Sequence, residues 1–155
     1  MHISWDEYFM GVALLSAKRS KDPNTQVGAC IVREDKRIVG IGYNGFPTGC
    51  SDDVFPWGKG NKNDLLNKYP FVVHAEANCI LNASSSVKGA TLYVTLFPCN
   101  ECAKLIIQSG IKHLVYMCDK YRDETSSVAS RMMLDAAGID YRQMDEIEVT
   151  INAKK

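Results

Sequence analysis

No apolar run in the sequence comes near the roughly 20 residues that a membrane-spanning helix needs. The N-terminal segment MHISWDEYFMG also lacks the basic stretch and the long apolar core that are typical of a signal peptide. These absences predict a cytoplasmic protein, with access to the nucleus left open, and no membrane partner.

An excess of charge of either sign is missing as well. Lys and Arg together number 18, and so do Asp and Glu, which makes the formal net charge +0. A protein that holds DNA or tRNA through its phosphates needs a basic face. The balance therefore argues against a nucleic-acid polymer as a partner. It leaves a small phosphorylated substrate open, because one or two local cations can hold a single phosphate.

Internal repeats and low-complexity segments are absent too. The 155 residues, of which 46% are hydrophobic, suit one globular domain with a continuous core. We therefore predict a single domain over residues 1–155, with a disordered tail at 152–155.

The pattern SWDE places Ser4 three residues before Glu7, and such a pair forms a capping box at the start of a helix. Apolar residues at helical spacing predict that this helix runs to about Arg19 and ends before Pro23. The runs QVGACIV and RIVGIGY, rich in valine and isoleucine and joined by polar residues, predict an antiparallel hairpin.

From residue 75 onward, helical and strand patterns alternate. Helices are predicted at 75–84, 101–109 and 127–137, strands at 90–96 and 112–118, and an edge strand at 147–151. Strand–helix–strand order implies parallel pairing through right-handed crossovers. The predicted fold class is α/β: a three-layer α/β/α domain whose mixed sheet of about five strands carries helices on both faces.

Residues 44–70 break this pattern, with three prolines and little periodicity. A loop of this length in a compact domain is often functional, and a solvent-exposed insertion is the alternative interpretation. The sequence alone does not choose between them.

Cys99 and Cys102 lie three positions apart, directly before a helical pattern. Their spacing suits a disulfide, a redox pair or two ligands of one metal. His74 begins another helix, and the N-termini of neighbouring helices can converge at one end of an α/β sheet. One imidazole and two thiolates have the softness that Zn²⁺ prefers, and they leave a fourth tetrahedral position free, as in a catalytic site.

Glu76 follows His74 by two residues, where its carboxylate could act as general acid and base on a water at the open position. The combination H-x-E and P-C-x-x-C is the signature of zinc-dependent nucleobase deaminases. A disulfide is disfavoured in a reducing compartment, and a redox pair leaves His74 and Glu76 unexplained. A structural zinc with Cys50 as the fourth ligand remains an alternative.

The sequence resembles the cytidine deaminase superfamily, and within it the deoxycytidylate (dCMP) deaminase family. The similarity covers nearly the whole chain, and GYNGFP, CSDD, HAEANCIL, LFPCNECAK and DKYRDE carry it. It implies the hydrolysis of dCMP to dUMP and ammonia, which supplies dUMP for dTTP synthesis. It assigns His74, Cys99 and Cys102 as zinc ligands and Glu76 as the group that moves the proton.

The resemblance also implies a homohexamer that dCTP with Mg²⁺ activates and dTTP inhibits. The regulatory segment of the family maps onto Gly42, Tyr43, Asn44 and Gly45. Glycines beside an amide at the end of a strand let a ligand approach the backbone closely, although an ordinary turn is the alternative. Asn44 could instead contact the 3′-hydroxyl of the substrate.

By the same resemblance, the substrate site includes Ala75 of the HAE motif and two residues of DKYRDE. Tyr121 is assigned to stacking on the base or to gating, and Arg122 to the phosphate. The Arg-Ser-Lys cluster at 19–21 offers further phosphate ligands, with a solvated cluster as the alternative.

One zinc ion per chain is predicted, because the long loop has no histidine to help hold the second, structural zinc of some phage members of the family. Cys50 is then a free thiol, and His113 has no metal role. Two other functions stay open: deamination of another small cytosine nucleoside or nucleotide, and a catalytically silent nucleotide-binding subunit. Glu76 argues against the silent subunit, which has no use for a carboxylate beside an open metal position.

Overall fold

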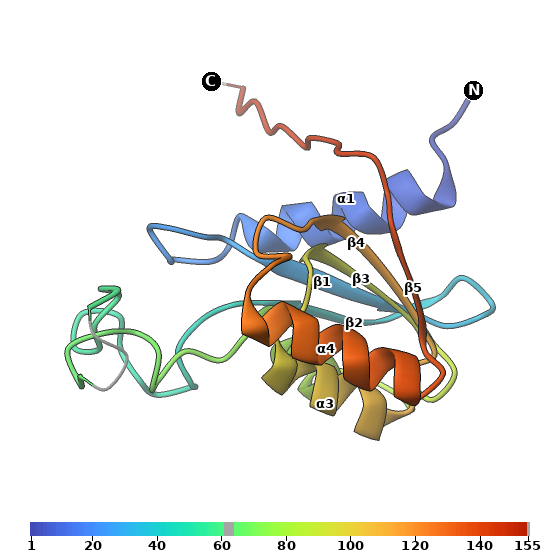
Figure 1. Ribbon diagram of the computed structural model, residues 1–155. Helices are drawn as coiled ribbons and strands as arrows, with labels where there is room; N and C mark the ends of the chain where they lie inside the picture. The colour runs from blue at the N-terminus through green and yellow to red at the C-terminus, as the bar shows by residue number, and fades with distance from the viewer. Residues whose placement is uncertain (61–63, 155) are drawn as a thin grey trace.

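The structure is a computed structural model that describes residues 1–60 and 64–154. Its sheet has five strands in the order β2-β1-β3-β4-β5 (Figure 1). The strands are β1 (Gly28–Val32), β2 (Ile38–Tyr43), β3 (Thr91–Leu96), β4 (His113–Cys118) and β5 (Asp140–Gln143), and the helices are α1 (Trp5–Ala17), α2 (Ala75–Leu81), α3 (Asn100–Ser109) and α4 (Thr125–Ala136).

The sheet is mixed, as predicted. Strand β1 runs antiparallel to both β2 and β3, which confirms the hairpin. Strands β3, β4 and β5 are parallel, which confirms the crossovers through α3 and α4. The carboxyl ends of β3 and β4 therefore meet at one edge of the sheet, and the helices that follow them begin there.

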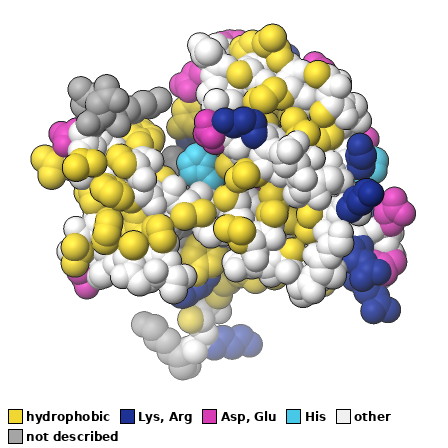
Figure 2. Space-filling model, turned by 90° about the horizontal axis from the view of Figure 1, so that it is seen from below, with side chains coloured by type: hydrophobic (Ala, Val, Ile, Leu, Met, Phe, Trp, Pro, Cys, Tyr) yellow, Lys and Arg dark blue, Asp and Glu magenta, His cyan; other side chains and the backbone are white. Residues whose placement is uncertain are grey.

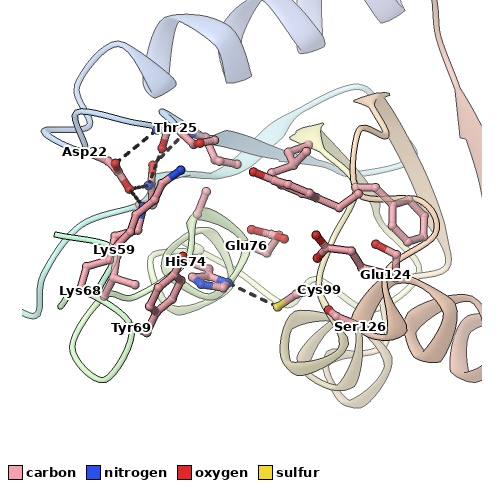
Figure 3. Close-up of a pocket in the computed structure, with 18 residues that line it drawn as sticks. Asp22, Thr25, Lys59, Lys68, Tyr69, His74, Glu76, Cys99, Glu124 and Ser126 are labelled. Carbon is pink, nitrogen blue, oxygen red and sulfur yellow. Dashed lines mark hydrogen bonds and ion pairs between the residues drawn. The ribbon is translucent and has the colours of Figure 1, made fainter. Parts of the chain in front are cut away.

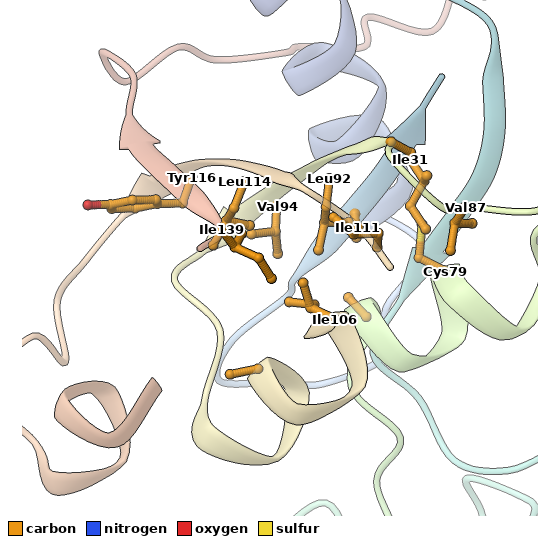
Figure 4. Close-up of a cluster of buried hydrophobic side chains, with 14 of the residues drawn as sticks. Ile31, Cys79, Val87, Leu92, Val94, Ile106, Ile111, Leu114, Tyr116 and Ile139 are labelled. Carbon is orange, nitrogen blue, oxygen red and sulfur yellow. The ribbon is translucent and has the colours of Figure 1, made fainter. Parts of the chain in front are cut away.

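Alternation of side chains along the strands divides the core into two layers. On one face, α2, α3 and α4 cover the sheet, and Ile106 of α3 packs with Leu92 and Leu114 (Figure 4). The other face carries α1 (Figure 1). Phe9 of this helix packs against Tyr93. The three-layer fold class is confirmed, with one helix on one face and three on the other.

The start of α1 follows the predicted capping box. The Ser4 hydroxyl accepts a hydrogen bond from the Glu7 amide at 3.0 Å, and the Glu7 carboxylate accepts one from the Ser4 amide at 3.0 Å. The helix ends at Ala17, two residues before the predicted end.

The predicted edge strand at 147–151 was wrong. The fifth strand is β5, and residues 144–154 form no strand. Two apolar side chains of 147–151 turn to α1 instead: Ile147 packs on the cluster beneath α1, and Val149 lies beside Gly11. Ile151 is exposed. Alternating apolar residues can thus pack against a helix as well as in a sheet. Residues 152–154 are exposed without regular structure, and Lys155 lies outside the described residues.

Between β2 and α2 the described residues of the 44–70 loop form turns and irregular backbone, and residues 61–63 lie outside the described part. The loop carries its own aromatic cluster. The ring of Phe46 lies 4.2 Å from that of Trp57, and the ring of Phe55 packs edge-on against Phe71 at 5.2 Å. No helix in the described part of the chain is long and apolar enough to span a membrane.

Candidate active site

The N-termini of α2 and α3 bring three metal-ligating side chains to one point. His74 and Cys99 are the N-cap residues of the two helices, and Cys102 lies in the first turn of α3. The Nδ1 atom of His74 lies 3.4 Å from the Sγ of Cys99 and 3.5 Å from that of Cys102. Within residues 1–60 and 64–154, no other group of three His, Cys, Asp or Glu side chains brings its ligand atoms this close together.

The two N-cap residues of this His-Cys-Cys group do not cap their helices. An N-cap side chain normally accepts a hydrogen bond from the first turn, as Ser4 does in α1. Neither His74 nor Cys99 makes a side-chain cap hydrogen bond. Their side chains face each other instead (Figure 3). The sequence thus places ligands where a stable helix would place serine or aspartate.

The thiols of Cys99 and Cys102 do not ionise independently. A hydrogen bond from Cys102, assisted by His74, lowers the pKa of Cys99 well below its ordinary value. The same contact, together with burial, raises the pKa of Cys102. A second thiolate at this point therefore needs a cation beside it. All six cysteines are free in the structure, and one imidazole with two thiols around a common point fits a zinc ion with three protein ligands.

Glu76 is the second residue of α2, and only 4% of it is exposed. Burial raises the pKa of its carboxyl group to about 6, while the charge of His74 opposes the shift. Figure 3 shows the carboxylate beside the imidazole and the Cys99 thiol. A carboxyl group that is neutral or charged near neutral pH can both accept and donate a proton.

These groups lie in a cavity of about 430 Å³. Figure 2 shows a histidine side chain in a hollow of this face of the molecule. In Figure 3, Asp22, Lys59 and Lys68 lie at one end of the cavity, and Cys99 and Glu124 lie toward the other. The cavity thus has a cationic end and a metal-ligating end.

Three of the predicted substrate residues line this cavity: Asn44, Ala75 and Tyr121. The amide of Asn44 is buried, donates to the Thr25 carbonyl at 3.0 Å and accepts from the Val27 amide at 2.8 Å. It therefore also holds the backbone that forms one wall.

The predicted phosphate ligands lie outside the lining. Arg122 is exposed and is not among the lining residues. In the 19–21 cluster, the Ser20 hydroxyl donates to the Asn44 carbonyl at 2.9 Å, and Lys21 pairs with Asp52 at 3.0 Å. Ser20 thus holds Asn44 in the wall of the cavity, whereas Lys21 is paired outside the lining.

Sequence analysis missed Lys59 and Lys68, which the 44–70 loop brings into the lining. The loop folds back so that the Lys68 amide donates to the Gly58 carbonyl at 2.9 Å. Lys68 forms a buried ion pair with Asp22. The only sequence signal was the loop itself, because no local pattern shows where its lysines point.

The segment 42–45 contacts α2 at two points and the chain just before α2 at a third. A Cβ atom at Gly42 would lie 2.4 Å from the Cys79 nitrogen, so only glycine fits there. The Tyr43 carbonyl accepts a hydrogen bond from the Asn78 side chain at 2.9 Å. Gly45 forms a two-sided backbone bridge with Val73, directly before His74.

Fold and site together define an enzyme class: an α/β domain with a metal site at paired helix N-termini and a buried carboxylate beside it. Residues 3–118 match the model of the cytidine and deoxycytidylate deaminase zinc-binding region. The chain therefore belongs to the cytidine and deoxycytidylate deaminase family.

Individual proteins that are similar to the chain are deoxycytidylate deaminases by name. The human deoxycytidylate deaminase is 59% identical over 143 residues, which are 92% of this chain and 80% of the relative. A probable deoxycytidylate deaminase of Drosophila melanogaster is 60% identical over 148 residues, which are 92% of this chain and 73% of the relative. The crystal structure of dCMP deaminase from the cyanophage S-TIM5 in complex with dCMP and dUMP is similar, with a TM-score of 0.72 and 29% identity over 93% of this chain and 99% of that one.

Proposed function

We propose that the chain is a zinc-dependent hydrolase that converts dCMP and water to dUMP and ammonia. The observation that carries this proposal is a buried carboxylate, Glu76, in the same cavity as a His-Cys-Cys donor set. The names of the similar proteins support dCMP as the substrate.

His74, Cys99 and Cys102 would hold the zinc ion. When bound, zinc supplies a positive charge that lowers the pKa of a coordinated water toward neutrality. Glu76 takes a proton from the attacking water and delivers it to ring N3 of the cytosine. The remaining proton of the new hydroxyl group passes through the same carboxylate to the amine, which leaves as ammonia.

Replacing Glu76 by glutamine tests this mechanism. We expect Glu76→Gln to lower kcat by roughly 10²- to 10⁴-fold, the range for loss of a general acid–base, and to retain zinc, because Glu76 is not a ligand. Glu101→Gln is a matched control: Glu101 is also the second residue of its helix, but it is exposed. Steady-state kinetics and metal analysis measure both effects. Unchanged turnover in Glu76→Gln would contradict the mechanism and favour another role for the site.

We propose that the deoxyribose lies along Asn44 and that Tyr121 stacks on the base or gates the cavity. The phosphate then has two candidate ligands, Arg122 from the sequence resemblance and Lys59 from the lining of the cavity. The cavity favours Lys59, because Arg122 is exposed outside the lining. Lys68 is less available to a phosphate, since its charge is paired with Asp22.

Two charge-neutralising variants separate these candidates. We expect Lys59→Gln to raise KM for dCMP by about tenfold, the loss of one charge-assisted contact of about 1.4 kcal/mol. Arg122→Gln should leave KM within a factor of about two, a difference of less than 0.5 kcal/mol. If Arg122→Gln raises KM more than Lys59→Gln does, Arg122 and not Lys59 binds the phosphate.

We also propose that the protein is regulated: dCTP with Mg²⁺ activates it, dTTP inhibits it, and it assembles as a homohexamer. The resemblance supports all of these, and the contacts of segment 42–45 with the site support regulation through that segment. An effector that moves Gly42 or Gly45 also moves α2 or Val73, and with them His74 and Glu76. Light scattering and titration of the activity with each nucleotide test these proposals.

A further inference from the structure

We infer that three residues of α4, Ser126, Ser130 and Arg131, position the Cys99 thiolate for the metal. They act on the ligand loop, residues 97–100, which consists of the connection after β3 and the first residue of α3. The inference rests on the proposed function, because it takes Cys99 as a zinc ligand. None of the three residues is a ligand itself, so their role is positioning.

Ser126 supplies the cap that Cys99 does not. The first amides of a helix have no partner within the helix, and the side chain of Cys99 forms no cap because it faces His74. The amide of Asn100, the first residue of α3, donates instead to the hydroxyl of Ser126 at 3.3 Å. A neighbouring helix thus stabilises the N-terminus of α3 and leaves the Cys99 sulfur free.

Ser130 holds the other side of Cys99. It is fully buried, and its hydroxyl donates to the Pro98 carbonyl at 2.9 Å. The same hydroxyl lies 3.0 Å from the Ser126 carbonyl, one helical turn earlier. Residues four apart share a helix face, so both serines meet the ligand loop together. The peptide bond between Pro98 and Cys99 is therefore fixed by a hydrogen bond.

Arg131 fixes the beginning of the ligand loop. Its guanidinium group lies over the Phe97 ring, 4.0 Å from the centroid, and forms an ion pair with Asp119, the residue directly after β4. The amide of Phe97 donates to the Cys118 carbonyl at 2.9 Å. Since Phe97 lines the cavity, Arg131 orients both the cavity wall and the chain that leads to Cys99.

The residues on both sides of Cys99 are thus each held by α4, whereas Cys99 is turned to the metal site. Hydrogen bonds behind a ligand commonly set its orientation, and their loss typically weakens metal binding by 10- to 100-fold. We expect the α4 contacts to act in this way on Cys99.

Competition with a chromophoric zinc chelator tests the inference on the purified protein. Ser126→Ala and Ser130→Ala should each weaken zinc binding by roughly tenfold, and Ser126→Thr, which keeps the hydroxyl, should restore it. Ser109→Ala is the matched control, because it removes a hydroxyl-to-carbonyl bond of 2.8 Å at the far end of α3. Its zinc affinity should equal that of the unmodified protein. In the cobalt-loaded protein, the thiolate absorption bands should shift for the two α4 variants and not for Ser109→Ala.

Zinc affinities of Ser126→Ala and Ser130→Ala equal to that of Ser109→Ala would overturn the inference. If Ser130→Ala fails to fold, the partly exposed Ser126 and its alanine and threonine variants decide the question. Failure of the proposed function looks different: the unmodified protein would then not turn over dCMP or would bind no zinc, whatever the zinc affinities of the variants relative to it.

Discussion

Two glycines three residues apart in the segment 42–45 carry different constraints. At Gly42, a Cβ atom would lie 2.4 Å from the Cys79 nitrogen and 2.5 Å from the Ala75 carbonyl oxygen, both backbone atoms of α2. At Gly45, a Cβ atom would meet nothing within 4 Å. The first glycine is therefore needed for β2 to pack on α2, and the second is not.

Alanine at these two positions should distinguish the closely packed glycine from the open one. We expect Gly42→Ala to lower the free energy of unfolding by about 1–3 kcal/mol, the usual cost of overpacking, and to weaken zinc binding, because α2 carries His74. Gly45→Ala should change the unfolding free energy by less than about 0.5 kcal/mol. Urea unfolding of both variants checks this, and equal stability of the two would contradict the packing argument.

At the scale of single residues, the convergence of His74, Cys99 and Cys102 could be predicted from sequence, and the surroundings of this group could not. His74, Glu76 and Cys99 carry motifs whose spacing follows from the first turn of a helix. Lys59 and Lys68 carry no motif, and their place in the cavity depends on how the 44–70 loop folds back. The α4 serines likewise act through contacts with a distant loop, which no local pattern records.

At the scale of elements, two ion pairs join the 44–70 loop to the segment after α1, and one pair is buried whereas the other is exposed. The side chains of Lys68 and Asp22 are 9% and 2% exposed. Those of Lys21 and Asp52 are 67% and 31% exposed. A buried charge that loses its partner is costly, whereas an exposed pair contributes little.

Replacing each lysine by methionine compares the two pairs directly. Lys68→Met should lower the free energy of unfolding by about 3–5 kcal/mol, because it leaves the buried Asp22 without a cation. Lys21→Met should lower it by about 1 kcal/mol or less. Denaturant titration measures both values. Similar stability of the two variants would show that the loop does not depend on the buried pair.

The elements themselves were largely predictable, since apolar periodicity and capping set them locally. The hairpin, the helices and the parallel strands followed from these signals. The fifth strand did not, because the sequence of β5, DYRQ, is polar, as an edge strand tolerates. The alternating segment 147–151 was the stronger local signal, but packing against α1 determined its place.

At the scale of the whole molecule, Asp6 joins α1 to two strands of the sheet. It accepts two hydrogen bonds from Arg142 of β5, at 2.7 and 2.8 Å, and one from the hydroxyl of Tyr93 in β3 at 2.6 Å. The bonds from Arg142 hold the pKa of Asp6 below its ordinary value of 3.8, against the opposing effect of burial. The charged form of Asp6 thus stabilises the fold.

The lowered pKa of Asp6 predicts how the free energy of unfolding depends on pH. A carboxyl group with a depressed pKa in the folded state contributes stability above its unfolded pKa and loses it as the pH falls through its folded pKa. Asp6→Asn should therefore lower the free energy of unfolding by about 1 kcal/mol at pH 7. The difference from the unmodified protein should shrink below a pH of about 4.

Urea unfolding at several pH values between 7 and 3 checks the prediction, with Asp35→Asn, in the hairpin turn, as a control for loss of an exposed carboxylate. A difference for Asp6→Asn that stays constant with pH would mean that the charge of Asp6 does not act between α1 and the sheet.

The central claim is the deamination of dCMP at the His74–Cys99–Cys102 site. The most direct test follows the ultraviolet absorbance change of the zinc-loaded protein with dCMP, deoxycytidine and CMP side by side. We predict turnover of dCMP that exceeds that of deoxycytidine by at least tenfold, because the cationic end of the cavity holds the phosphate. Equal turnover of deoxycytidine would contradict the phosphate assignment, and no turnover of dCMP would contradict the proposed function.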